Sequence, residues 1–181
     1  SVAHDRGFPC FVKCPQSGSS RLMGRAEDFD KLCKLIAELG EESDELLVES
    51  AVCGTEFSCP VLHLPGGSVR ALPPIEIRPK SVFFDYKAKY TTGESEELVP
   101  APQPPELLKQ IQQVALRADA ALGCRGITRT DMILSNETLY VLEINTLPGM
   151  TPNSLAPKSF KAEGGTYSQL LDILIQTALP R

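Results

Sequence analysis

The chain has 181 residues, of which 42% are hydrophobic and 23% are charged, a composition typical of a globular protein with a buried core. A formal net charge of −5 offers no basic surface for nucleic acid, and no apolar run approaches the length of a membrane span. Six cysteines are scattered without the spacing of a zinc site. We therefore expect free thiols in a cytoplasmic protein that binds neither nucleic acid nor membrane.

The first quarter of the chain alternates short β-rich segments with one amphipathic helix. Strands are expected at 8–13, 22–25 and 46–49. A helix is expected at 27–39, with Phe29, Leu32, Cys33, Ile36 and Leu39 at helical spacing as its packing face. The Gly/Ser loop after Lys13 is suited to covering phosphates with backbone N–H groups, and an ordinary hairpin loop is the alternative.

The middle of the chain reads as further strands. One is expected at 55–64 before a Pro-Gly-Gly turn, another at 69–72, and a short edge-like one at 75–79. The aromatic segment 83–90 is followed by a polar stretch, 91–97, which fits a mobile loop tip. A Pro-rich approach leads to a helix whose apolar face runs from Leu107 to Leu122. The last helix is expected at 168–179, and the residues it would turn to the core are Leu170, Leu171, Leu174, Ile175 and Ala178.

Two β-branched runs, 126–134 and 138–146, predict a hairpin. If its turn centres on Glu137, Asp131 lies opposite Glu143 and Arg129 lies opposite Asn145, with all four side chains on one sheet face. Two carboxylates, a carboxamide and a guanidinium suit Mg²⁺ and a phosphoryl group. A salt-bridged, solvent-facing hairpin is the alternative.

The turn cluster 147–152 places backbone amides and the Ser154 hydroxyl just beyond this set. The hairpin and this turn together resemble the C-terminal signature of D-alanine–D-alanine ligases of the ATP-grasp superfamily. The matching residues are R-x-D in the first strand and then L-E-I-N-T-L-P-G-M-T-x-x-S-L-x-P. A second segment, F-x-D-Y-x-x-K-Y at 83–90, is similar to their active-site loop. V-K-x-x-x-x-G-S-S is similar to their phosphate-covering loop, although Cys14, Ser17 and Leu22 depart from the usual Pro, Glu and Gly.

The resemblance extends from about Phe11 to the end and implies an α+β fold of the ATP-grasp type. That fold has a small lid subdomain and an antiparallel sheet flanked by helices. Residues 1–52 would be part of the central, lid-like subdomain, and residues 53–181 the C-terminal catalytic subdomain. The implied activity is ATP-dependent ligation of two D-alanines through a D-alanyl phosphate, for peptidoglycan synthesis.

The resemblance also implies site residues. Metal ligands for two Mg²⁺ (or Mn²⁺) ions would be Asp131, Glu143 and Asn145. Arg129 and the Gly149 N–H would stabilise the tetrahedral oxyanion, and Ser154 would bind the carboxylate of the second D-alanine. The residues implied to contact ATP are Lys13, Glu49, Glu56 and Lys89. Tyr90 would hydrogen-bond Ser19 and orient substrate. The histidines, His4 and His63, lie outside these matches and are assigned no catalytic role.

Several expectations concern partners. The ligases have more chain before this region, including the site of the first D-alanine and a second ATP-contacting lysine. We therefore expect a C-terminal half that works with a missing N-terminal half of the same enzyme, or the ligase end of a fusion with a muramate–alanine ligase, with a homodimer also possible. A non-catalytic nucleotide-binding or partner-binding fragment is the alternative. The second substrate is left open among D-alanine, D-lactate and D-serine.

Overall fold

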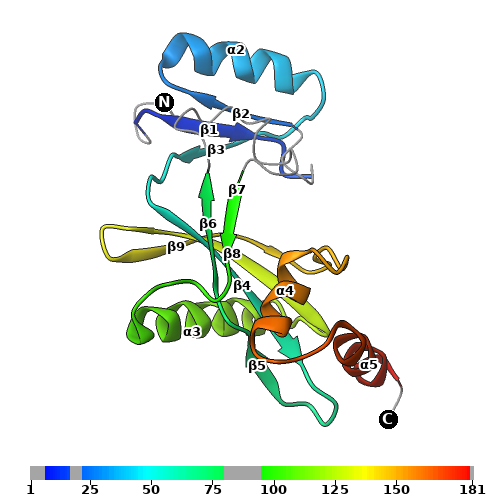
Figure 1. Cartoon of the computed structure of the whole chain (residues 1–181). Coiled ribbons are helices and arrows are strands. Elements are labelled where there is room, and N and C mark those ends of the chain that lie inside the picture. Colours follow the sequence, from blue (N-terminus) through cyan, green and yellow to red (C-terminus); the bar gives the residue numbers. More distant parts are fainter. Residues whose placement is uncertain (1–6, 17–21, 80–94, 180–181) are drawn as a thin grey trace. The chain divides into compact units, whose positions relative to one another are not determined.

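A computed structural model of the chain describes residues 7–16, 22–79 and 95–179. These residues form two compact units, an N-terminal unit, Ser1–Val52, and a C-terminal unit, Cys53–Arg181. Both units combine antiparallel strands with helices (Figure 1). This confirms the expected α+β class.

The N-terminal unit is a three-stranded antiparallel sheet with one helix on it. Its strands are β1 (Cys10–Lys13), β2 (Met23–Ala26) and β3 (Leu47–Ser50), in the order β2-β1-β3. The helix α2 (Phe29–Gly40) begins after Asp28, whose side chain accepts a hydrogen bond of 2.8 Å from the Lys31 N–H. Such a cap satisfies one of the amides left unpaired at a helix start.

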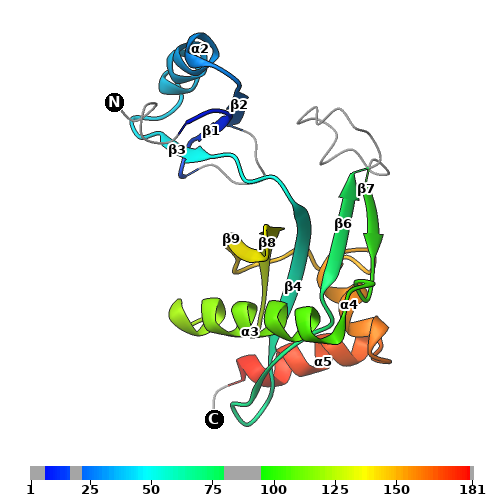
Figure 2. The same ribbon diagram turned by 90° about the vertical axis from the view of Figure 1, so that its left-hand side faces the viewer.

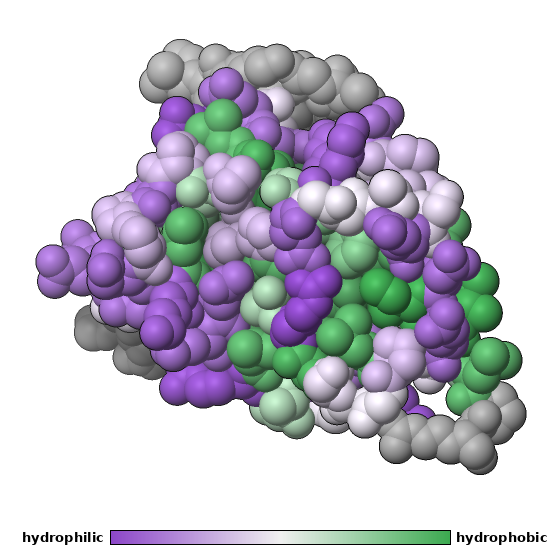
Figure 3. All heavy atoms as spheres, turned by 60° about the horizontal axis from the view of Figure 1, so that its bottom comes forward, coloured by the Kyte–Doolittle hydropathy of each residue, from purple (hydrophilic) through white to green (hydrophobic). Residues whose placement is uncertain are grey.

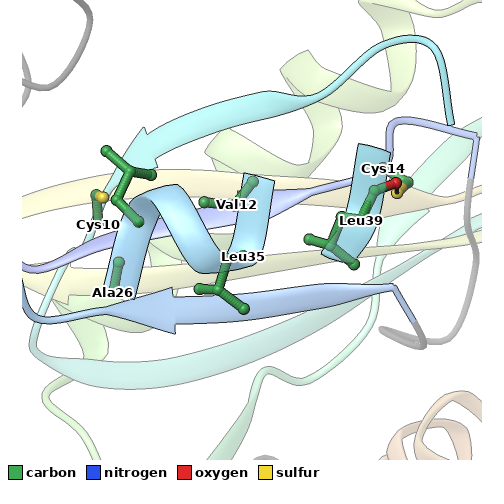
Figure 4. Close-up of a cluster of buried hydrophobic side chains, with 7 residues drawn as sticks. Cys10, Val12, Cys14, Ala26, Leu35 and Leu39 are labelled. Carbon is green, nitrogen blue, oxygen red and sulfur yellow. Dashed lines mark hydrogen bonds between the residues drawn. The ribbon is translucent and has the colours of Figure 1, made fainter. Parts of the chain in front are cut away.

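The core of this unit lies between α2 and the sheet, where side chains from β1 and β2 point toward the helix (Figure 4). The helix contributes Leu32, Leu35 and Leu39. The expected packing face was therefore partly wrong, because Phe29 is 57% exposed and Ile36 is 42% exposed. A sheet of three short strands covers only one stripe of the helix, and the stripe through Leu35 is the one it buries.

The C-terminal unit is built on a six-stranded antiparallel sheet. The order is β7-β6-β4-β8-β9, and β5 pairs with β4 beside this path. The strands are β4 (Thr55–His63), β5 (Val69–Ala71), β6 (Ile75–Pro79), β7 (Ser95–Leu98), β8 (Ile127–Ser135) and β9 (Thr138–Asn145).

Two expectations about this sheet were wrong. The strand at 75–79 is not at an edge, because β6 lies between β7 and β4. The expected loop tip does not extend to residue 97, since Ser95–Leu98 is β7 and pairs with β6. The edge position of β7 explains the second error, because an outer strand can be short and polar and still be held by one partner. The aromatic segment 83–90 lies outside the described residues.

Helices cover both faces of this sheet (Figures 1 and 2). On one face α3 (Pro105–Ala121) packs Ile111 and Ala115 against Phe57, Cys59, Val61 and Met132. On the other face, α4 (Leu155–Ala162) and α5 (Tyr167–Ala178) pack against Leu62, Leu72 and Ile127. The sequence did not predict α4, because Pro157 interrupts its pattern; a proline is tolerated in a first helical turn, where its N–H has no helical partner.

The last helix buries less than expected. Leu170 is its only buried residue among those described, and Ile175 and Leu179 are each 60% exposed. On the face of the molecule seen in Figure 3, apolar residues lie at the surface among polar ones. Only one stripe of α5 is buried against the sheet of the C-terminal unit, just as only one stripe of α2 is buried against the sheet of the N-terminal unit.

A buried polar cluster joins α3 to the sheet. Asp119 of α3 is 2% exposed, and its carboxylate accepts a 2.6 Å hydrogen bond from the Thr128 hydroxyl and lies 2.9 Å from His63 Nε2. Buried carboxylates need such partners. His63 therefore has a structural contact in the C-terminal unit.

All six cysteines lie in the described ranges and are free, in agreement with the sequence. Within those ranges, none of the helices combines the length and apolar character needed to cross a lipid bilayer.

Candidate active site

The polar face of the β8–β9 hairpin forms as expected, but for a different reason. Asp131 pairs with Glu143 and Arg129 pairs with Asn145. The turn is not centred on Glu137: Ser135 pairs directly with Thr138, and both turn residues have positive φ, 46° at Asn136 and 65° at Glu137. This is the backbone of a two-residue hairpin turn.

A register shift restores the expected pairs. Met132 pairs with Val141 and Asp131 with Glu143, so Leu142 is an extra residue in β9, a β-bulge. Bulges increase the local twist of a sheet and are frequent beside active sites, where they redirect a side chain. Here the bulge brings Glu143 and Asn145 into phase with Asp131 and Arg129.

Asp131 is the centre of the cluster. Arg129 donates two hydrogen bonds to it, from Nε to Oδ1 at 2.9 Å and from a terminal nitrogen to Oδ2 at 2.8 Å. Asn145 Nδ2 donates to Oδ2 at 3.0 Å and lies 3.4 Å from Glu143 Oε1. The Arg129 and Asp131 side chains are only 20% and 13% exposed. A forked, partly desolvated pair of this kind fixes both side chains firmly.

The sequence missed one member of the cluster, Ser58 of β4. Its hydroxyl donates to Asp131 Oδ1 at 2.6 Å, and its residue is fully buried. Ser58 pairs with Asp131 across the sheet, and Glu56, two residues earlier, lies on the same face. Ser58 is identified by the register in which β4 pairs with β8, and the sequence of β4 alone does not give that register.

The turn after β9 holds Gly149 against Ser154. A Cβ atom at Gly149 would lie 3.0 Å from the Ser154 hydroxyl oxygen, so a larger residue would fit only if the Ser154 side chain moved slightly. The Ser154 hydroxyl accepts a hydrogen bond from the Thr151 N–H at 3.1 Å and lies 2.9 Å from the Thr151 hydroxyl. Tyr167 of α5 donates to the Met150 carbonyl at 2.5 Å. The turn is therefore tied to both helices that follow it.

The N-terminal unit brings together two other candidates. Lys13 Nζ lies 2.5 Å from Glu49 Oε2, and the two side chains are 28% and 43% exposed. Residues 10 and 12 of β1 point into the core under α2, so Lys13 projects from the opposite face of the sheet. Three candidates, Ser19, Lys89 and Tyr90, lie outside the described residues.

The donor set suits a hard divalent cation. Asp131, Glu143 and Asn145 supply two carboxylates and an amide, and Mg²⁺ commonly takes one or two carboxylates with substrate phosphates. In the described part of the chain, no three His, Cys, Asp or Glu side chains converge as a metal site. The Asn145 carboxamide could offer its oxygen to such a cation only after the amide turned, because its Nδ2 group now faces Asp131.

Two thiols of the C-terminal unit have a raised pKa. Burial raises the pKa of Cys59 to about 12. Burial also raises the pKa of Cys124, and the negative charge of Asp119 raises it further. Because the thiolate is the reactive form, the raised pKa values lower the reactivity of both thiols near neutral pH.

The family described as "D-ala D-ala ligase C-terminus" matches residues 1–176. The chain belongs to this family. It is 44% identical over 175 residues to the D-alanine--D-alanine ligase of Leptospira biflexa, a match that covers 95% of this chain and 50% of that protein.

Further relatives give the same assignment. The D-alanine--D-alanine ligase of Oleidesulfovibrio alaskensis is 44% identical over 174 residues, covering 95% of this chain and 55% of that protein. The chain thus spans about half the length of the relatives it matches.

Solved ligase structures share the fold. The Bacillus anthracis D-alanine--D-alanine ligase complexed with ATP is 36% identical, with a TM-score of 0.79 over 97% of this chain and 55% of that one. The VanG D-Ala:D-Ser ligase of Enterococcus faecalis is 33% identical, with a TM-score of 0.86 over 98% of this chain and 52% of that one. The ATP-grasp fold expected from the sequence is confirmed.

Proposed function

We propose that this chain is the C-terminal, nucleotide-binding and metal-binding part of an ATP-dependent ligase. That ligase joins two D-alanines through a D-alanyl phosphate, for peptidoglycan synthesis in the cytoplasm. The observation that carries the proposal is the Arg129–Asp131–Glu143–Asn145 cluster, in a chain of this family. The N-terminal unit would act as part of the lid-like subdomain and the C-terminal unit as the catalytic subdomain.

Two Mg²⁺ (or Mn²⁺) ions, held by Asp131, Glu143 and Asn145, would neutralise the charge of the phosphates. Arg129 is held by Asp131 through two hydrogen bonds, so the orientation of its guanidinium is fixed. It would stabilise the developing oxyanion together with the Gly149 N–H. Electrostatic stabilisation of this kind contributes about 3–4 kcal/mol per donor in other enzymes.

The other candidates would bind the substrates. Lys13 and Lys89 would neutralise phosphate charge, and Glu49 and Glu56 would meet the adenine amine and the ribose hydroxyls. Ser154 would accept the carboxylate of the second D-alanine, with Tyr90 and Ser19 orienting substrate. The Ser154 hydroxyl accepts the Thr151 N–H, and its own proton is available for that carboxylate when the Thr151 hydroxyl, 2.9 Å away, donates to it.

Calorimetric titration of the 181-residue chain with ADP and Mg²⁺ tests the proposal. We expect saturable binding that disappears with EDTA and weakens at least about tenfold in Asp131→Asn/Glu143→Gln, because this variant loses both anionic ligands. Asp172→Asn, an exposed carboxylate of α5, is the matched control and should bind as the wild type does.

Two results of this titration would contradict the proposal. A folded wild type that binds no nucleotide would contradict a self-sufficient nucleotide site in this chain. Equal binding by the double variant would contradict the metal ligands.

A further inference from the structure

The short helix α4 is held to the sheet by an ion pair at each of two places. Lys158 Nζ lies 2.6 Å from Glu97 Oε2 of β7. Beyond its C-terminal end, Glu163 pairs with Arg70, and the guanidinium of Arg70 lies 5.7 Å from the centre of the Phe160 ring. A helix of two turns is not stable alone, so such tertiary contacts determine its position.

The two ion pairs differ in their distance from the candidate site. Ser154 is the N-cap of α4, and its carbonyl accepts the N–H of Lys158 at 3.0 Å, one turn along. Lys158 and Ser154 therefore lie on the same side of the helix. The Arg70–Glu163 pair lies past the other end, beside the core residue Phe160.

Glu97 belongs to the face of the sheet that carries the cluster. It pairs with Ile77 of β6, and Ile77 pairs with Glu56 of β4. Glu56 is two residues before Ser58, which donates to Asp131. Since paired residues share a face, Lys158 connects α4 to the row of side chains next to Asp131.

We propose that Lys158 and Glu97 are positioning residues for the second substrate. Their ion pair holds the first turn of α4, and with it the Ser154 hydroxyl and the Gly149–Thr151 turn, at a fixed place on the carboxylate-bearing face. This inference rests on the proposed function, in which Ser154 binds the carboxylate of the second D-alanine.

Steady-state kinetics of the full-length ligase test the role. Lys158→Met should raise the KM of the second D-alanine roughly threefold to tenfold, the scale of a partly buried ion pair, and leave the KM values of ATP and the first D-alanine within about twofold. Lys158→Arg keeps the pair and should keep the wild-type KM. Glu163→Gln, the matched control, removes the other ion pair of α4 and should not change this KM.

The double variant Lys158→Met/Glu97→Gln separates anchoring from charge compensation. Anchoring predicts a KM as high as in Lys158→Met, because the connection is lost in both. A KM restored to the wild-type value would overturn the proposal, since it would mean that only the unpaired Glu97 charge disturbed binding. An equal rise in Glu163→Gln would also overturn it, because general loosening of α4 would then suffice.

Hydrogen exchange in the 181-residue chain provides a test independent of ligase activity. The Thr151 and Ser154 amides are hydrogen-bonded within the turn, and they should exchange several-fold faster in Lys158→Met but not in Glu163→Gln. Unchanged exchange would refute the anchoring. If the wild-type ligase formed no dipeptide from D-alanine, the proposed function would fail, and the exchange rates would still decide whether the pair holds the turn.

Discussion

At the scale of single residues, β8 carries charged side chains on one face and fully buried uncharged side chains on the other. Arg129 and Asp131 face the cluster, whereas Thr130 between them is fully buried on the other face. The Thr130 hydroxyl oxygen is the one buried side-chain polar atom without a hydrogen-bond partner among the described residues. A buried hydroxyl without a partner costs stability, because it has lost its hydrogen bonds to water.

Thr130→Val should therefore stabilise the protein. Valine has nearly the same shape and removes the unpaired hydroxyl, so the free energy of unfolding should rise by about 1 kcal/mol. Urea denaturation of the C-terminal unit measures the change. Thr128→Val is the matched control: its hydroxyl donates to Asp119, so this substitution should destabilise, and the same sign for both variants would contradict the argument.

At the scale of elements, the sequence predicted much of the hairpin that forms the candidate site. Its strands, and the pairs Asp131–Glu143 and Arg129–Asn145, are where the alternation of side chains placed them. The tight turn and the bulge at Leu142 were not predicted. The tight turn shifts the pairing of the two strands by one residue, and the bulge shifts it back by one. The pairs near the site are therefore those of a regular hairpin with a wider turn, and the sequence alone does not reveal the two shifts.

The bulge gives a test of what the site requires. Deleting Leu142 should leave Glu143 opposite Asp131 in a regular ladder, so Mg²⁺-dependent ADP binding should largely persist, within about tenfold. Deleting Ile144 should turn Asn145 to the other face of the sheet and abolish binding. Titration calorimetry of the two folded deletion variants compares them. Equal loss in both would show that the twist of the bulge itself is required.

The helices show the limit of periodicity. The pattern located α2, α3 and α5 within a few residues, but it assigned Ile36 and Ile175 to cores that leave them exposed. It missed α4, and with α4 the Lys158–Glu97 pair. Such contacts depend on which elements meet, and residue spacing within one element does not specify that. Ser58 was missed for the same reason.

At the scale of the whole molecule, the two units have separate cores. One core contains Val12, Leu35 and Leu39, and the others contain residues of the C-terminal unit only. A unit of about fifty residues buries a smaller fraction of its surface than a larger domain does and is marginal in stability. We expect the two units to unfold in separate transitions.

Leu35→Ala tests this independence. The leucine is 7% exposed, so truncation should cost the N-terminal unit about 2–5 kcal/mol. Differential scanning calorimetry should show one transition moved to lower temperature and the other unchanged. Leu170→Ala, in a core of the C-terminal unit, should do the reverse. A single transition that both variants shift equally would contradict separate units.

The position of β9 has a practical consequence for the isolated chain. Among the described strands it lies at one end of its sheet, and Tyr140, Val141 and Leu142 are 44%, 45% and 38% exposed. Outer strands with uncovered apolar side chains are templates for pairing with another molecule, which natural proteins suppress with charges. Glu143, the first charged residue after this apolar run, is also a candidate metal ligand. The residue that protects the edge from aggregation is thus the one whose charge a bound cation would neutralise, so solubility and metal loading oppose each other at this strand.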